Sequence, residues 1–162
     1  MAKKTDNKGD QSSSIKVVNK KAYHNFEFIE KLEGGLSLVG TEVKSLRAGG
    51  ADLNGSYARI DSNGECWLVG ATIAAYEKAG YGNHEPKRSR KVLLHRYEIR
   101  KIRGKLDQRG FTLVPLRIYF NNRGIAKIEL ALAKGKRQYD KRSSIAERQQ
   151  KRDIDRSMKK YR

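Results

Sequence analysis

The chain has 162 residues, and its 36 lysines and arginines against 18 acidic residues give a formal net charge of +18. This length fits one domain with appendages, and the charge indicates a polyanionic partner. We expect no membrane partner, because the longest nearly apolar run, residues 68–76, is far shorter than the roughly 18 residues that a span requires. The single cysteine, Cys66, excludes an intramolecular disulfide, and the first residues lack the apolar stretch of a secretory signal, so we expect a cytoplasmic protein.

Apolar side chains divide the chain into three predicted segments. Residues 1–15 hold too few of them to offset the entropy of ordering the chain, so we predict a disordered N-terminal segment. Residues 16–133 carry apolar residues with regular spacing and turn signals, and we predict that they form the folded domain. Residues 134–162 are mostly basic and polar, which predicts a tail that is disordered in the free protein.

The first half of the folded segment contains two strand signals and one helix signal. Alternating apolar residues before and after Gly34-Gly35 predict two strands joined by a tight turn at this pair. A short helix follows, and Thr41 is placed to cap it. Asn63-Gly64 then stands between two alternating runs, which is the strongest short-range signal of a hairpin.

The second half contains a helix and a further hairpin. Ile99, Ile102 and Leu106 share one face at helical spacing, which predicts an amphipathic helix with basic residues on its outer side. The residues after this helix alternate again, with Gly124 near the predicted turn. Pro115 cannot donate a hydrogen bond within a sheet, so we expect it at an edge or a bulge.

These elements predict a mainly β fold. About six short antiparallel strands with two or three flanking helices can remove their exposed edges by closing on themselves, so we predict a small OB-like β-barrel. Such barrels recur among nucleic-acid-binding proteins, but the fold alone does not establish a function.

No catalytic or metal chemistry is indicated. The three histidines, His24, His84 and His95, lack the spacing of metal ligands, and one cysteine cannot build a zinc cluster. Residues 35–41 have the glycine spacing of a phosphate loop but not its lysine. No nucleophile and base can be paired from spacing, so the sequence offers nothing that favours an enzyme.

Three basic clusters stand out: Lys20-Lys21, residues 86–91 (PKRSRK) and residues 134–137 (KGKR). Each cluster alone could be solvated surface, but three on one small domain favour contacts with nucleic-acid phosphates. We predict RNA rather than DNA, because a rigid barrel suits irregular loops and no recognition helix or zinc finger is present.

The tail has the pattern of a conditional helix. Ser144 and Glu147 form a capping box, and the basic residues after them recur every four positions. That row is made of Arg148, Arg152, Arg156 and Lys160. Because a narrow apolar patch opposite the row cannot anchor the helix, we propose that the tail folds when it binds RNA phosphates. A tail that stays disordered and adds only nonspecific affinity is the alternative.

These segments resemble the SsrA-binding protein family (small protein B, SmpB). The resemblance runs from about residue 19 to residue 142 and continues loosely through the tail. It rests on six motifs in the family order, which read NKKAYHNFEFIE, GTEVKSLRAG, SYARI, RKVLLHRYEI, GFTLVPLRIYF and KGKRQYDKR.

The resemblance implies a cytoplasmic, non-enzymatic adapter in trans-translation. Such an adapter binds the tRNA-like domain of transfer-messenger RNA and delivers it to stalled ribosomes for rescue and peptide tagging. The barrel would replace the missing anticodon arm, and the tail would become helical in the empty mRNA channel and the decoding centre. The implied partners are transfer-messenger RNA, the ribosome and, indirectly through the RNA, elongation factor Tu. We expect a monomer without a metal or cofactor.

The resemblance and the basic clusters together identify candidate binding residues. The expected contacts with transfer-messenger RNA are Lys20, Lys21, Glu33, Lys91, Leu93 and His95. The expected contacts at the decoding centre are Lys134, Gly135, Lys136, Arg137, Tyr139, Asp140, Lys141 and Arg142. The expected contacts of the tail with ribosomal RNA are Arg148, Arg152, Arg156, Met158, Lys159 and Lys160. Leu93 could instead be buried, and Tyr139 could be exposed rather than stacked on a ribosomal base.

A structural ribosomal protein is the main alternative, since it would share the charge, the small barrel and the basic tail. It would stay bound stoichiometrically to ribosomal subunits through high salt, whereas an adapter would follow transfer-messenger RNA. An RNA-modifying enzyme would require a cofactor pocket or a catalytic set, which the sequence does not indicate.

Overall fold

The computed structural model describes residues 16–80, 82–108, 110–136, 149–150, 154 and 158. Its helices are α1 (Lys20–Asn25), α2 (Gly40–Arg47) and α3 (Arg96–Leu106). Its strands are β1 (Lys16–Val18), β2 (Phe26–Leu36), β3 (Ala51–Asp52), β4 (Tyr57–Ile60), β5 (Cys66–Val69), β6 (Thr72–Ile73), β7 (Arg90–Leu93), β8 (Phe111–Phe120) and β9 (Ala126–Gly135). None of the helices in this part of the chain has the length and apolar content needed to cross a membrane.

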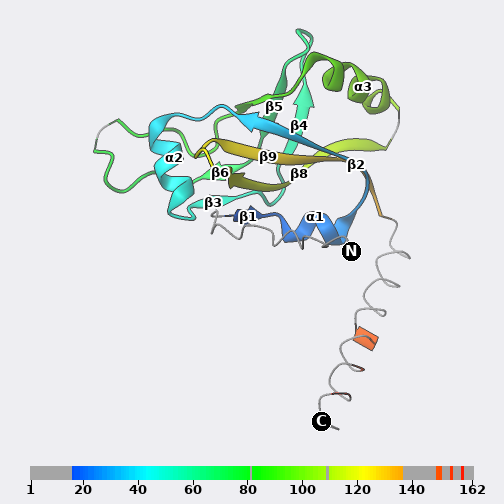
Figure 1. The fold of residues 1–162 in the computed structure, drawn as a ribbon, viewed down its shortest axis with the longest axis horizontal. Coiled ribbons are helices and arrows are strands. Elements are labelled where there is room, and N and C mark those ends of the chain that lie inside the picture. The colour runs from blue at the N-terminus through cyan, green and yellow to red at the C-terminus, as the bar shows by residue number, and fades with distance from the viewer. Residues whose placement is uncertain are drawn as a thin grey trace, which may run out of the picture.

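Six strands close into a barrel (Figure 1). The strands β8, β4, β5, β7, β2 and β9 hydrogen-bond in this order, and the pairing of β8 with β9 closes the ring. Every neighbouring pair in the ring is antiparallel. β1 extends the sheet at β8, and β3 and β6 form a separate two-stranded ribbon beside α2. The predicted mainly β barrel with flanking helices is therefore confirmed.

The inside of the barrel is filled by alternating side chains. On β9, Ile128, Leu130 and Leu132 are completely buried, and Leu113 of β8 joins them. α3 adds Ile102 to the same core, which confirms the predicted amphipathic helix. Because strand residues alternate between the two faces, the residues between these positions point outward and are available for other contacts.

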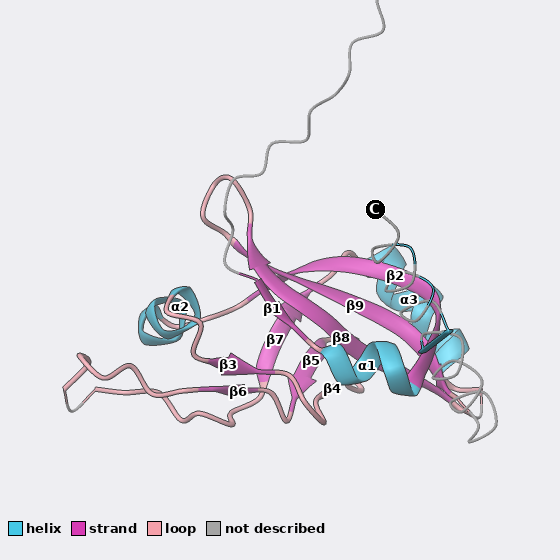
Figure 2. Ribbon diagram, turned by 90° about the horizontal axis from the view of Figure 1, so that it is seen from below, coloured by secondary structure: helices cyan, strands magenta, loops and turns pink. Residues whose placement is uncertain are grey.

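α1 covers one part of the outer surface of the barrel, against β8 (Figure 2). A small apolar cluster lies between α1 and the outer sides of β8 and β9. Its buried members are Ala22, Val114, Leu116, Ala131 and Ala133. The apolar pattern of the sequence does not predict α1, because a helix of 6 residues is too short to show an apolar period.

Asn19 fixes α1 on the barrel. Its Oδ1 accepts a hydrogen bond of 3.1 Å from the Ala22 amide, which caps the helix. Its Nδ2 donates to the carbonyl oxygens of Leu53, at 3.0 Å, and of Pro115, at 3.1 Å. The register of β8 against β9 shifts between Pro115 and Arg117, so the predicted bulge at Pro115 is confirmed.

Both predicted hairpins are confirmed. Gly64 lies in the turn between β4 and β5 with a φ of +75°, and Gly124 lies between β8 and β9 with a φ of +73°. Glycine adopts such left-handed backbone angles without the steric cost that a Cβ atom would add. The two turns therefore set the register of the paired strands.

The predicted tight turn at Gly34-Gly35 is wrong. β2 runs without interruption from Phe26 to Leu36 through both glycines. A Cβ atom on Gly34 would lie only 2.9 Å from side-chain carbons of Val92 and Leu94. Gly34 is therefore required for the close approach of β7 and the residues after it, and not for a change of chain direction.

The predicted cap of α2 is also wrong, although the helix exists. α2 begins at Gly40, and the Glu42 carboxylate accepts a 2.9 Å hydrogen bond from the Val39 amide. Thr41 lies inside the helix, and its Oγ1 hydrogen-bonds Nδ1 of His84 at 2.9 Å. Thr41 thus ties α2 to the segment before β7.

Two predicted segments fall mainly outside the described residues. These are the N-terminal residues 1–15 and most of the tail, for which disorder in the free protein stays a prediction. β9 continues to Gly135, past the predicted domain boundary at residue 133. The boundaries of the three segments remain predictions.

Candidate nucleic-acid interface

A band of outward-pointing side chains crosses the barrel from β8 to β7, and we call it the exposed barrel face. Tyr119 lies opposite Lys127 on β9, and Lys127 lies opposite Gly35 on β2. Gly35 in turn lies opposite Leu93 on β7. The side chains of this face are Glu33, Lys91, Leu93, Arg117, Tyr119, Lys127 and Glu129. Three of the predicted RNA contacts therefore belong to one surface.

Glu33 is held in place at this face. The Tyr119 hydroxyl donates a hydrogen bond to its carboxylate, and Lys127 Nζ lies 3.5 Å from it. Partial burial, followed by the hydrogen bond and the charge of Glu33, raises the pKa of Tyr119 to about 12. The phenol therefore remains a donor at neutral pH. The Glu33 side chain is still 53% exposed, so its carboxylate can accept further hydrogen bonds.

Leu93 is exposed, and the alternative of a buried Leu93 is wrong. The residue is 55% exposed. A Cβ atom on Gly35 would lie 3.4 Å from the Leu93 Cβ, so the leucine covers the glycine on the neighbouring strand. The result is an apolar contact surface beside the Glu33 carboxylate. Such a surface can pack against a ribose or an unstacked base, which a purely charged site cannot do.

Lys91 is already paired. Its ammonium group forms an ion pair with Glu65, and both side chains are a little more than one third exposed. A phosphate contact at Lys91 would therefore compete with Glu65. Because exposed ion pairs contribute about 0–1 kcal/mol, this competition is weak.

His95 stands at the start of α3. Its amide donates a 2.8 Å hydrogen bond to Glu98, which satisfies one of the free amides at the beginning of the helix. Its ring stacks on Tyr97 with 5.6 Å between the ring centroids and 17° between the planes. Tyr97 is 63% exposed, so this stacked pair offers a flat surface to a partner.

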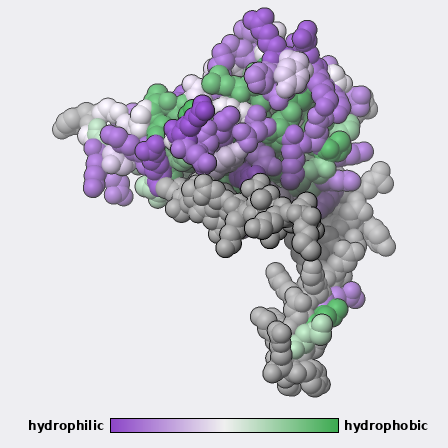
Figure 3. Space-filling model, in the orientation of Figure 1, coloured by the Kyte–Doolittle hydropathy of each residue, from purple (hydrophilic) through white to green (hydrophobic). Residues whose placement is uncertain are grey.

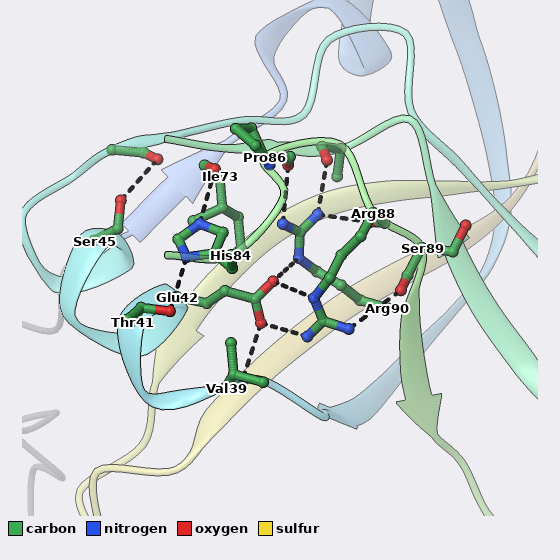
Figure 4. A network of polar contacts seen from close by, with 12 residues as sticks. Val39, Thr41, Glu42, Ser45, Ile73, His84, Pro86, Arg88, Ser89 and Arg90 are labelled. Atoms are coloured by element: carbon green, nitrogen blue, oxygen red, sulfur yellow. Dashed lines mark hydrogen bonds and ion pairs between the residues drawn. The ribbon is translucent and has the colours of Figure 1, made fainter. Parts of the chain in front are cut away.

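The basic run of residues 86–91 is only partly available to a partner (Figure 4). Arg90 is completely buried and donates to Glu42 at 2.9 Å. Arg88 donates to the same carboxylate from Nε at 2.7 Å and from Nη2 at 2.5 Å. Arg90 also donates to the carbonyl oxygens of Ala71 and Pro86. The interpretation of this run as a phosphate-binding cluster is therefore wrong for Arg88 and Arg90.

Glu42 is the internal partner of both arginines, and no motif in the sequence indicates this role. Burial by itself would raise the pKa of Glu42, but three influences outweigh it. Hydrogen bonds from Arg88 and the Val39 amide, with the positive charges of Arg90 and Arg88, hold the pKa of this carboxyl below its ordinary value of 4.5. Glu42 is thus ionised at neutral pH, and it joins α2 to the segment that leads into β7. Glu42 is the third residue of α2, and an acid in the first turn of a helix gives no sequence pattern that reveals distant partners.

Two further predicted sites lie near α1. Lys20 and Lys21 are exposed on this helix. At its other end, the Lys136 amide donates a 2.9 Å hydrogen bond to the Asn25 carbonyl, and its Nζ donates to the Tyr23 carbonyl at 3.5 Å. Lys136 is therefore attached to the end of α1, whereas the exposed residues Lys134 and Gly135 before it still belong to β9.

The other predicted ribosome contacts fall almost entirely outside the described residues. Met158 is described, in helical backbone and 71% exposed. The predicted contacts outside the described residues are Arg137, Tyr139, Asp140, Lys141, Arg142, Arg148, Arg152, Arg156, Lys159 and Lys160.

The histidines and the cysteine that could have acted as metal ligands or as a nucleophile have structural surroundings. His84 bonds Thr41 and the Ile73 carbonyl, and His24 bonds Asn25. Burial raises the pKa of the Cys66 thiol to about 12, so this thiol is not a nucleophile at neutral pH. In the described part of the chain, no cluster of three or more histidine, cysteine or acidic side chains could hold a metal ion.

Comparisons with known proteins agree on one family. The family model described as SmpB protein matches residues 16–160. The SsrA-binding protein of Syntrophobacter fumaroxidans is 49% identical over 160 residues, which cover 98% of each chain. The SsrA-binding protein of Pelotomaculum thermopropionicum is 52% identical over 148 residues, which cover 90% of this chain and 95% of the relative.

A solved structure is also similar. It is described as "tmRNA-SmpB: a journey to the center of the bacterial ribosome", and one of its chains is 49% identical to this chain. The TM-score is 0.66, with 81% of this chain and 94% of that chain covered. A family match over most of the length, relatives near one half identity and a shared barrel lead to one conclusion: the chain belongs to the SmpB, or SsrA-binding protein, family.

Proposed function

We propose that this chain is an RNA-binding adapter that binds the tRNA-like domain of transfer-messenger RNA and delivers it to stalled ribosomes for trans-translation. The observation that carries the proposal is the exposed barrel face. There Glu33 and Leu93, which are far apart in the sequence, stand exposed on neighbouring strands. The family membership supports the same assignment.

The chemistry of this face suits irregular RNA better than a plain phosphate backbone. The Glu33 carboxylate repels phosphates but accepts hydrogen bonds from base N–H groups and 2′-hydroxyls. Leu93 beside it packs against a sugar or base, while Lys127 and Arg117 attract the backbone around them. This combination selects a particular RNA shape, and the surrounding positive charge supplies affinity that depends on salt.

The proposed division of labour gives RNA binding to the barrel and ribosome entry to the tail of residues 134–162. The Asn25 carbonyl holds Lys136, so the tail leaves the barrel from a defined point at α1. The basic side chains of the tail would displace counterions from ribosomal phosphates in the empty mRNA channel and the decoding centre. In this scheme the protein is a cytoplasmic, non-enzymatic adapter, and no residue acts in catalysis.

The test compares two RNAs of similar length and charge. The full chain is titrated with a transcript of the tRNA-like domain and with an ordinary tRNA, across a range of salt concentrations. We expect the preference for the tRNA-like domain to persist as salt weakens both complexes. Equal affinity for the two RNAs would refute the adapter proposal. Retention on ribosomal subunits at one copy each through high salt would instead identify a structural ribosomal protein.

A further inference from the structure

α3 carries two groups of basic side chains with different surroundings. On one flank, Lys105 Nζ lies 2.7 Å from the Glu30 carboxylate, and Lys101 forms a second ion pair with it. Hydrogen bonds first from Lys101 and then from Lys105 lower the pKa of Glu30, which keeps this carboxyl ionised. These two lysines therefore attach α3 to β2 and are already satisfied.

The second group is unpaired among the described residues. Within the described chain, the side chains of Arg96, Arg100 and Arg103 form no hydrogen bond or ion pair. All three are exposed. They occupy positions i, i+4 and i+7, so they form a single stripe along the helix, on the flank of its apolar face away from the two lysines. We call this stripe the α3 arginine row.

The row begins close to the exposed barrel face in the chain, because Arg96 follows Leu93 by three residues. The chain passes from Leu93 on β7 through His95 into α3, and the stacked, exposed Tyr97 ring lies in the first turn of the helix beside the row. Hydrophilic side chains cover much of the upper part of the molecule in Figure 3, where Figure 1 places α3. An aromatic and a cationic group, Tyr97 and Arg96, thus lie within four residues of Leu93 in the chain.

The arrangement has a cost that a partner would remove. Like charges at helical spacing repel one another by about 0.2–0.5 kcal/mol per pair in water. Glu98, the acid nearest to Arg96 in the helix, is occupied by the His95 amide. The Cβ atoms of residues at this helical spacing are about 5–6 Å apart, which is close to the spacing of a line of phosphates. Each guanidinium group can donate two hydrogen bonds to one phosphate.

We propose that the α3 arginine row binds the sugar–phosphate backbone of the same transfer-messenger RNA that the exposed barrel face holds, and that Tyr97 stacks on one of its unpaired bases. This inference rests on the proposed function. The closeness of Arg96 and Tyr97 to Leu93 in the chain favours this RNA over ribosomal RNA. The apolar side of α3 is used inside the barrel through Ile102, which leaves no apolar face for a membrane.

The test is a triple substitution with a matched control. Arg96→Gln, Arg100→Gln and Arg103→Gln remove three charges and keep the helix propensity nearly unchanged. The control removes three exposed, unpaired charges elsewhere in the described chain. It carries Arg59→Gln, Lys78→Gln and Arg123→Gln. Both full-length variants are titrated with the tRNA-like transcript against salt concentration, and circular dichroism checks their folding.

We expect the α3 variant to lose about three units of salt slope and about tenfold or more in affinity, and the control to change far less. Equal losses in the two variants would show that only net charge matters, and would overturn the inference. So would unchanged RNA affinity with weakened ribosome binding, since the row would then face ribosomal RNA. If the parent protein binds the transcript and the α3 variant binds it equally well, this inference fails and the adapter function stands.

A second pair of variants tests the stacking. Tyr97→Phe keeps the ring, whereas Tyr97→Ala removes it. Since base stacking on an aromatic ring is worth about 1–3 kcal/mol, we expect Tyr97→Ala to weaken binding by roughly 5- to 150-fold and Tyr97→Phe to bind like the parent. Equal affinity of both variants and the parent would overturn the role of Tyr97.

Discussion

The outer surface of the β8–β9 hairpin has two halves that differ in their partners. In the half nearer α1, the outward residues are apolar, and Val114, Leu116 and Ala131 are buried under the helix. In the other half the outward residues are polar or charged, such as Arg117 and Lys127, and they remain accessible. The change occurs at the bulge after Pro115. One hairpin thus provides a covered half for stability and an open half for recognition.

The largest effect is expected where the covered half meets the tail. Ending the chain after Lys136 keeps β9 and the hydrogen bond to Asn25 but removes the proposed ribosome contacts. We expect peptide tagging on stalled ribosomes to be abolished, while the preference for the tRNA-like domain over ordinary tRNA persists. Loss of that preference together with tagging would contradict the separation of the two roles.

A change in the covered half should reduce stability alone. Leu116 lies on β8 and is completely buried in the apolar cluster under α1. Leu116→Ala therefore leaves a cavity and should lower the free energy of unfolding by about 2–5 kcal/mol. Denaturant titration measures this loss. RNA affinity of the folded fraction should equal that of the parent, and a selective loss of affinity would show that the covered half also recognises RNA.

The matching change in the open half should have the opposite profile. Leu93 is exposed, so Leu93→Ala should alter the free energy of unfolding by less than about 0.5 kcal/mol. It should weaken binding of the tRNA-like transcript by roughly 5- to 30-fold, since about 1–2 kcal/mol of apolar contact would be lost. Ile125→Ala, at an equally exposed position in the β8–β9 turn, is the control and should bind normally.

The smallest effect is expected from ionisation of the Tyr119 hydroxyl in the open half. The pKa of Tyr119 is raised from 10.0 to about 12, so the folded state holds this proton more tightly than the unfolded state. The resulting stability is fully present below pH 10 and is lost as the pH rises towards 12. Difference spectra between the parent and Tyr119→Phe should show one tyrosine that ionises late. Ionisation near pH 10 would mean that the bond to Glu33 does not form in solution.

The sequence predicts most of the fold because its local signals are strong. Asn63-Gly64 and Gly124 mark turns that need left-handed glycines, and Ile128 and Leu130 mark a strand with one buried face. Gly34 was misinterpreted for a physical reason. A glycine that makes room for a neighbouring strand and a glycine that turns the chain look the same until the neighbour is known.

The interface was less predictable than the fold. Leu93 is exposed beside Gly35, which has no side chain to cover it. Arg88 and Arg90 form ion pairs within the protein because they meet Glu42, which lies more than 40 residues away in the sequence. Composition counts all these cations alike, although some stabilise the fold and others face solvent. Which cations are paired inside the protein and which face solvent becomes visible only when segments far apart in the sequence are brought together by the fold.

The position of β9 in the sheet has a mechanical consequence. This strand is hydrogen-bonded to β2 on one side and to β8 on the other over most of its length, and it continues directly into the tail. A pull on the tail therefore loads two rows of backbone bonds in shear, so that many bonds resist at once instead of opening one after another. A force applied to the end of β9 is therefore shared by both neighbouring strands of the barrel.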